Sequence, residues 1–141
     1  MGPNRLALTT LLLEFGASIQ TLTYAGGSAL TASCENEDAD PKVVELLLEH
    51  NAMVNYKLRS ATSKWKLIRL AATTAVRIFK TSNGLLKTLA EETGSTALHF
   101  AAMRGDMRIV ELLLSEGADP SLKNALGQDA AAMCKSFPEL R

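Results

Sequence analysis

Aromatic side chains are scarce in this 141-residue chain, where Phe, Trp and Tyr make up 5% of the residues although 47% are hydrophobic. A β-sandwich core usually contains more aromatic and β-branched side chains than this. Leu, Ala and Val supply the apolar content instead, and this balance favours an all-α core. The length corresponds to about one domain.

The chain also has no excess of either charge, because 15 basic and 15 acidic side chains give a formal net charge of zero. The whole molecule therefore lacks the positive field of a nucleic-acid-binding protein, and we expect no nucleic-acid partner. No apolar run reaches the roughly 18 residues that a membrane-spanning helix needs. The two cysteines, Cys34 and Cys134, form no ligand cluster, and we interpret them as buried free thiols of an intracellular protein, cytoplasmic or nuclear.

Sequence motifs for catalysis and cofactor binding are missing as well. The chain has no nucleophile elbow, no Gly-rich phosphate loop and no HExxH pair. The acidic loop at residues 35–40 does not have the spacing of an EF-hand. We therefore expect no enzyme, no metal site and no cofactor.

A repeated pattern is present instead. Three segments share a Leu-Leu-Leu run that is followed by Ala, at residues 11–17, 46–52 and 112–118. The first two runs start 35 residues apart and the last two start 66 apart, which is twice 33. This period predicts a repeat architecture, in which each unit buries its apolar faces against its neighbours.

Residues 94–121 resemble the ankyrin-repeat family, whose unit of about 33 residues is a β-turn followed by two antiparallel helices with a T-P-L-H-x-A signature. The corresponding residues here, with Ala in place of Pro, are Thr96-Ala97-Leu98-His99-Phe100-Ala101. The resemblance implies that Thr96 caps the first helix, that Leu98 lies in the core, and that His99 ties neighbouring loops together. Gly105 then forms the turn between the helices, and Gly117 ends the second helix.

Along the whole chain, the resemblance predicts a single ankyrin-repeat domain, an all-α solenoid of stacked helix-turn-helix units with short β-turn fingers. The predicted parts are a partial repeat at 1–20, a repeat at 21–55, an irregular segment at 56–91, a repeat at 92–122 and a partial repeat at 123–141. The last of these would stop near Pro138, where a second helix should begin. Both ends would then be uncapped, which favours weak self-association.

Residues 56–91 match the repeat poorly, and the sequence leaves two arrangements open for them. They form either a divergent repeat with a basic solvent face or a basic helical insertion. Residues 57–90 contain eight basic side chains and no acidic one. In the repeat register Trp65 aligns with the core residue Leu98, but Arg77 falls at a position that a repeat buries.

Residues 63–80 are also similar to the calmodulin-binding helices of calmodulin-regulated kinases. An apolar anchor follows a Trp anchor by 13 residues, within a basic amphipathic segment that suits a groove with an acidic rim. The residues of this candidate helix are Lys64, Trp65, Lys66, Arg69, Ile78 and Lys80. A calmodulin-responsive switch is therefore one alternative function.

The family resemblance implies a protein-binding surface on the concave side of the stack, formed by turn tips and first helices. Carried over by position, the tip residues are Tyr24 and Ala25, Arg59 and Ser60, Glu92 and Thr93, and Ala125 and Leu126, and the first helix adds Met103 and Arg104. Tyr24, Met103 and Arg104 are the expected anchors, since Tyr and Arg contribute strongly to interfaces. We predict a protein-interaction module or adaptor, with a partner that is acidic near residues 57–87. A regulatory ankyrin segment of a larger enzyme or channel is the other alternative.

Overall fold

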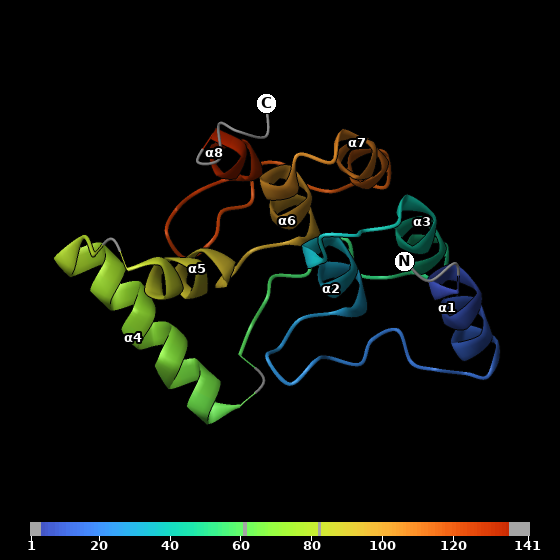
Figure 1. Cartoon of the computed structure of the whole chain (residues 1–141), viewed down its shortest axis with the longest axis horizontal. Helices are drawn as coiled ribbons and strands as arrows, with labels where there is room; N and C mark the ends of the chain where they lie inside the picture. Colours follow the sequence, from blue (N-terminus) through green and yellow to red (C-terminus); the bar gives the residue numbers. More distant parts are fainter. Residues whose placement is uncertain (1–3, 61, 82, 136–141) are drawn as a thin grey trace.

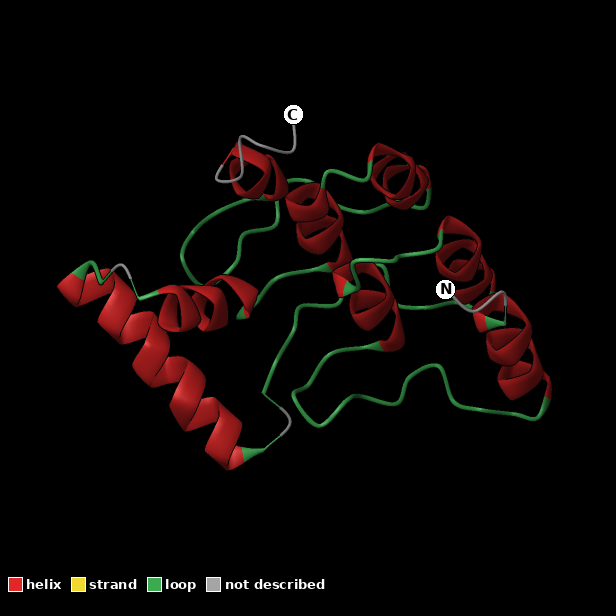
Figure 2. Ribbon diagram, viewed as in Figure 1, coloured by secondary structure: helices red, strands yellow, loops and turns green. Residues whose placement is uncertain are grey.

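The computed structural model describes residues 4–60, 62–81 and 83–135. In these ranges the helices are α1 (Arg5–Glu14), α2 (Ala29–Glu35), α3 (Pro41–Glu49), α4 (Ser63–Phe79), α5 (Gly84–Glu92), α6 (Ala97–Arg104), α7 (Met107–Ser115) and α8 (Ala130–Lys135). The described part of the chain contains no β-strand (Figure 2), so the predicted all-α class is confirmed. The expected chain stop near Pro138 lies outside the described residues.

Local sequence signals set the ends of the helices that carry the Leu-Leu-Leu pattern. Helices α3 and α7 begin after Asp40 and Asp106, whose side chains accept the backbone amide two residues further on, at 3.0 and 3.1 Å. Such caps satisfy amides that have no partner inside the helix. The three copies of the pattern end at Gly16, Asn51 and Gly117, all with positive φ, as residues beyond a helix C-terminus commonly have.

The helices form two rows (Figure 1). First helices pack against each other in the order α2, α6, α8, and second helices pack in the order α1, α3, α7. Buried residues from both rows form one core, and its largest fully buried members include Phe100, Leu30, Ile109, Leu113 and Val44. This arrangement is the stacked solenoid that the sequence predicts.

Each finger between successive repeats is closed by the same pair of backbone hydrogen bonds. The amide before the tip donates to the carbonyl after it, from Thr23 to Gly27 at 2.7 Å, from Leu58 to Ser95 at 2.8 Å and from Asn124 to Gln128 at 2.9 Å. The returning amide of Gly26, Gly94 or Gly127 completes the pair in its own finger. The three fingers therefore share one base although their tips differ.

The middle finger carries a large insertion in place of its tip. Gly26 follows Thr23 by three residues, whereas Gly94 follows Leu58 by 36, so the middle finger contains 33 additional residues. Helices α4 and α5 occupy this insertion and pack against each other at one side of the stack (Figure 1). Because α2 packs directly on α6, no layer of the stack separates the two repeats.

Of the two arrangements that the sequence leaves open for residues 56–91, the structure has the insertion, and the alternative of a divergent repeat in the stack is wrong. In the repeat register Ala72 would take the place of Gly105, where the left-handed backbone with φ 72° ends α6. Ala72 has no such break, and α4 continues through it for 17 residues. Among the described residues between Leu58 and Ala97, none belongs to the core cluster.

Candidate protein-binding surface

The predicted tip residues lie on three fingers. Tyr24 is 71% exposed at the tip of the first finger, with Ala25 half-buried beside it in sequence. Ala125 and Leu126 form the tip of the last finger and are also half-buried. The amide of Ala125 donates to the carbonyl of Thr93 at 2.8 Å, so this finger is bonded directly to the middle one. Of these tips, Tyr24 offers the largest free side chain.

The prediction treats the other four tip residues as two separate fingers, and this part is wrong. Arg59 and Ser60 follow Leu58 on the outgoing side of the middle finger, and Glu92 and Thr93 precede Gly94 on its returning side. The two pairs are thus the two ends of one insertion. A period of 33 residues assigned them to different repeats because the insertion has the length of one repeat.

Three predicted residues meet at a cavity of about 270 Å³ between α5, α6 and α8. Its lining residues are Thr88, Glu91 and Glu92 from α5, Phe100, Met103 and Arg104 from α6, and Met133 from α8. Thr88, Glu91, Phe100 and Met133 are absent from the predicted set. No periodic signal could place Thr88 or Glu91 here, since α5 belongs to the insertion and not to a repeat.

The walls of this cavity hold two carboxylates in a partly dry setting. Glu91 is 5% exposed, and its Oε1 has no hydrogen-bond partner among the described residues, although Lys87 Nζ lies 3.8 Å from it. Glu92 Oε2 lies 3.6 Å from Arg69 Nη1. Burial, reinforced by the negative charge of Glu35, raises the pKa of Glu92, and Arg69 offsets part of this rise. A cation in the cavity would therefore be favourable.

Arg104 is less available than the sequence suggests. Its Nη2 donates to the backbone carbonyl of Glu35, and its Nη1 lies 3.6 Å from Glu37 Oε1. The Glu35 carbonyl lies at the end of α2 and Glu37 lies in the loop that follows, and both belong to the preceding repeat. Arg104 therefore joins two repeats. Met103, which precedes it and lines the same cavity, is the more available of these two predicted anchors for contact with a partner.

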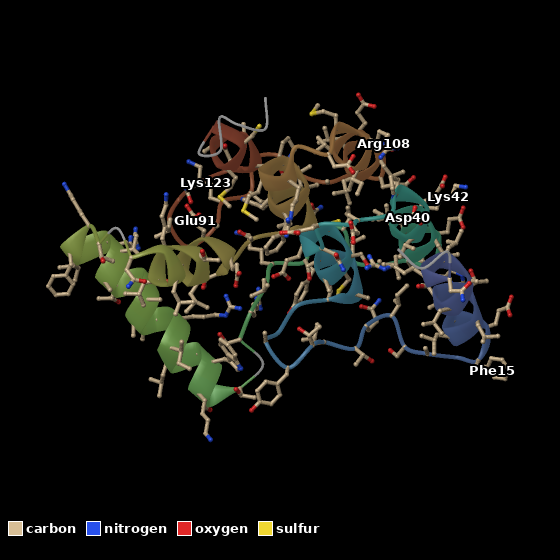
Figure 3. All side chains as sticks on the ribbon, in the orientation of Figure 1. Phe15, Asp40, Lys42, Glu91, Arg108 and Lys123 are labelled. Carbon is tan, nitrogen blue, oxygen red and sulfur yellow. The ribbon has the colours of Figure 1, made fainter. Side chains whose placement is uncertain are left out.

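The insertion is held to the stack by its last residues. The carbonyl of Glu91 accepts from Ser95 Oγ at 2.6 Å and from Asn124 Nδ2 at 3.0 Å. Asn124 and Ser95 are both buried finger residues. Figure 3 shows Glu91 on α5, near the finger that leads to α8. The position of α5 over the cavity is thus set by hydrogen bonds to two fingers.

His99 lies at the junction of two repeats and is 1% exposed. Its Nδ1 accepts the backbone amide of Thr96 at 3.1 Å, so the other nitrogen, Nε2, carries the proton and donates to the carbonyl of Gln128 at 3.1 Å. Burial lowers the pKa of His99 and favours this neutral form. In the preceding repeat, the buried Thr31 takes the place of His99, and its hydroxyl and amide bond to Ser28 within the same turn.

The candidate calmodulin-type helix coincides with α4, but its two anchors lie on different sides of it. Trp65 is half-buried, with the Arg69 guanidinium 5.7 Å from its ring centre, whereas Ile78 is 68% exposed. Residues 13 apart are separated by about 140° around a helix. Lys64, Lys66 and Lys80 are exposed, and Arg69 is buried against α5.

Within residues 4–60, 62–81 and 83–135 no cluster of three or more His, Cys, Asp or Glu side chains is placed to hold a metal ion. None of the helices in the same ranges has the length and apolar character needed to cross a bilayer.

Comparison with known proteins identifies the repeat. Residues 93–125 match the model of the ankyrin repeat family. The chain is 31% identical over 94 residues to BRCA1-associated RING domain protein 1 of Caenorhabditis elegans, which covers 67% of this chain and 13% of that protein. It is 40% identical over 63 residues to human ankyrin repeat domain-containing protein 29, and 43% identical over 63 residues to the Danio rerio protein of that name. These matches cover 45% of this chain and 19% and 20% of the relatives.

Among solved structures, the ankyrin repeat domain of Bcl-3, a member of the IkappaB protein family, is similar with a TM-score of 0.59 and 30% sequence identity. The likeness covers 88% of this chain and 40% of that one. The chain therefore spans between 13% and 20% of the length of these curated relatives, and less than half of the structural one.

Proposed function

Because this chain is an ankyrin-repeat protein, we propose that it binds a partner protein through the surface made by its fingers and first helices. Ankyrin repeats are in general protein-interaction modules, and the fold is typically non-enzymatic. The observation that carries the proposal is the cavity between α5, α6 and α8, which joins an apolar floor to two carboxylates. A rigid stack also loses little conformational entropy on binding.

The chemistry of the cavity favours a basic side chain of the partner. Phe100, Met103 and Met133 would contact the aliphatic stem of a Lys or Arg, and Glu91 and Glu92 would receive its charged end. The Oε1 atom of Glu91 lacks a hydrogen bond, so a cationic donor would remove an existing desolvation cost. Tyr24, exposed on the first finger, supplies a second contact of the kind that contributes strongly to interfaces.

Affinity capture from cell lysate tests this proposal, with bound proteins quantified for four baits. We expect Met103→Asp and Tyr24→Ala to lose the partners that the parent chain retains. Glu111→Gln, on the exposed side of the second helix α7, is the matched control and should retain them. Equal capture by Met103→Asp, with an unchanged unfolding midpoint, would overturn the proposal.

The calmodulin-responsive switch is the alternative that the same experiment separates, by adding calcium to one arm and a chelator to the other. It requires α4 to leave α5, because Trp65 contacts Arg69, which donates to the Leu89 carbonyl of α5 at 3.5 Å. This alternative predicts a calcium-dependent band that disappears with Trp65→Ala. A calcium-independent set of partners favours the adaptor.

A regulatory segment of a larger enzyme or channel is a second candidate function. It is supported by the small share, 13% to 20%, that the chain covers of its curated relatives, in which similar repeats belong to longer proteins. The length of the protein detected in cells by an antibody against this chain tests the idea. Detection of a protein much larger than 141 residues supports the regulatory segment, and detection of a protein of 141 residues contradicts it.

We also propose an intracellular location, in the cytoplasm or the nucleus, which the free thiols of Cys34 and Cys134 support. Weak self-association through the ends of the stack is a further expectation. Leu8 and Leu11 of α1 and Phe15 just after it are exposed, and Phe15 projects at the edge of the molecule (Figure 3). Concentration-dependent sedimentation would measure it.

A further inference from the structure

The insertion helix α4 is apolar on two opposite sides. Its inner side packs on α5 with the half-buried Trp65 and the buried Arg69 and Ala72. Its outer side carries Leu67, which is 67% exposed, Leu70, which is 61% exposed, and Ile78, which is 68% exposed. The fold of the insertion explains the inner side and gives the outer one no partner among the described residues.

The outer residues form one continuous stripe. Leu67, Leu70, Thr74 and Ile78 follow one another at intervals of three, four and four residues, which places them on one helix face. The polar member, Thr74, donates its hydroxyl to the carbonyl of Leu70 at 2.8 Å, inside the helix. The stripe therefore presents hydrocarbon and no side-chain donor that needs an outside partner.

Basic side chains border this stripe on both sides. At 100° per residue, Lys66 and Arg77 lie about 65–85° from the centre of the stripe on one side, and Lys64 lies about 75° from it on the other. All three are exposed, and none forms an ion pair within the described residues. The nearest acidic side chains along the chain are Glu49 and Glu91, so no negative charge within the helix offsets them.

We propose that the outer side of α4 docks on an anionic membrane surface, with the helix lying in the plane of the headgroups. Leu67, Leu70 and Ile78 would enter the boundary of the acyl chains, and Lys64, Lys66 and Arg77 would meet lipid phosphates. Positive charges on both sides of an apolar stripe match a uniformly negative plane. The docking is peripheral, because 17 residues of this composition do not span a bilayer.

Two observations favour a membrane over an acidic groove of another protein. A protein interface of ordinary size contains about one hydrogen bond per 100–200 Å², whereas the one polar member of the outer stripe, Thr74, already donates its hydroxyl inside the helix. The exposed side is also a single convex helix at the edge of the molecule (Figure 1), a shape that a planar surface can meet without a matching groove. Placing α4 on a membrane would hold the repeat stack beside it.

Vesicle co-sedimentation of the full chain tests the proposal, with phosphatidylcholine vesicles containing phosphatidylserine and with phosphatidylcholine vesicles alone. We expect partitioning into the anionic vesicles that is at least about tenfold stronger than into the neutral ones, since each basic residue contributes several-fold. Raising the salt concentration should weaken it. The double variant Leu67→Glu/Ile78→Glu should lose at least about tenfold, because both apolar contacts are lost.

The matched control is Leu8→Glu/Leu11→Glu, which replaces two exposed leucines of α1 and should bind within about twofold of the parent. Trp65 is the one tryptophan of the chain and lies on the inner side of α4, so its emission reports whether the insertion of each variant is folded. Absence of binding to anionic vesicles would overturn the proposal. So would equal binding by a folded Leu67→Glu/Ile78→Glu variant, and either result would leave an acidic protein as the ligand class to test.

Discussion

Replacing His99 with leucine tests the junction between two repeats. The substitution keeps an apolar body of similar size but leaves the Thr96 amide and the Gln128 carbonyl without the ring partners they now have at 3.1 Å each. Thr96 is 1% exposed, so water cannot replace the lost bond at its amide. The Gln128 carbonyl keeps the Asn124 amide as a donor at 2.9 Å, so the Thr96 amide is the group left without a partner. An orphaned buried group costs about 1–3 kcal/mol, and we expect a loss of about 2 kcal/mol in the free energy of unfolding, measured by urea denaturation. His50→Leu, at an exposed position, should change it by less than about 0.5 kcal/mol.

The same ring makes a pH-dependent contribution of known sign. Burial lowers the pKa of His99 in the folded chain below the ordinary value of 6.5. At a pH between the folded and the unfolded pKa, the unfolded chain therefore binds more protons than the folded one. The contribution of His99 is therefore complete above pH 6.5 and is lost as the pH falls towards the folded pKa. At pH 5.5 the loss is at most about 1.4 kcal/mol. The raised pKa of Glu92 acts in the opposite direction, so the comparison uses a Glu92→Gln background.

Two outcomes would refute this reasoning. The first is a His99→Leu variant whose free energy of unfolding stays within about 1 kcal/mol of the parent, since one orphaned group alone costs that much. The second is an NMR titration in which the pKa of the His99 ring lies above the ordinary value of about 6.5. Either result would mean that the ring does not hold the Thr96 amide and the Gln128 carbonyl as described.

Two further predictions concern backbone geometry and thiol chemistry. Gly94→Ala should lower the free energy of unfolding by about 1–3 kcal/mol, because φ is +76° and a Cβ would lie 3.3 Å from the amide nitrogen of Ala125. In the same denaturation experiment Gly84→Ala should be neutral or stabilising, since no atom lies within 4 Å of the Cβ it would add. Burial, with a smaller effect of Asp106, raises the pKa of Cys34 to about 12. This thiol should therefore react with a disulfide reagent at pH 8 at least about 100-fold more slowly than an ordinary thiol until the chain is unfolded. A fast reaction of Cys34 in the native protein would contradict its burial.

Most of the stack could be predicted from three local signals. The Leu-Leu-Leu runs locate α1, α3 and α7. In the two complete repeats, α3 and α7 bury Val44, Leu47, Ile109 and Leu113 at helical spacing. The motif around His99 locates α6. These signals depend on contacts between neighbouring repeats, which recur at a fixed period and therefore appear directly in the sequence.

The insertion could not be recognised in this way, because periodicity measures length and not connectivity. The 33 additional residues of the middle finger return the chain to the repeat register, so Gly84 and Gly117 keep the repeat spacing without being equivalent. Gly117 has a φ of 87°, whereas Gly84 opens α5 without a positive φ. The cavity could not be predicted for the same reason, since its α5 wall comes from the insertion. The bond of Arg104 to the Glu35 carbonyl could not be predicted either, because it depends on the fold of another repeat.

The middle finger shows that the hairpin between two ankyrin repeats can accept an inserted segment within a repeat array. Its two ends, Leu58 and Ser95, stay bonded at 2.8 Å while 33 extra residues fold outside the array. A foreign module whose termini lie equally close should be tolerated at the same place, since closing the ends of an insert adds little entropy once the base is formed. The array would then act as a scaffold that holds an inserted domain at a fixed position along the stack.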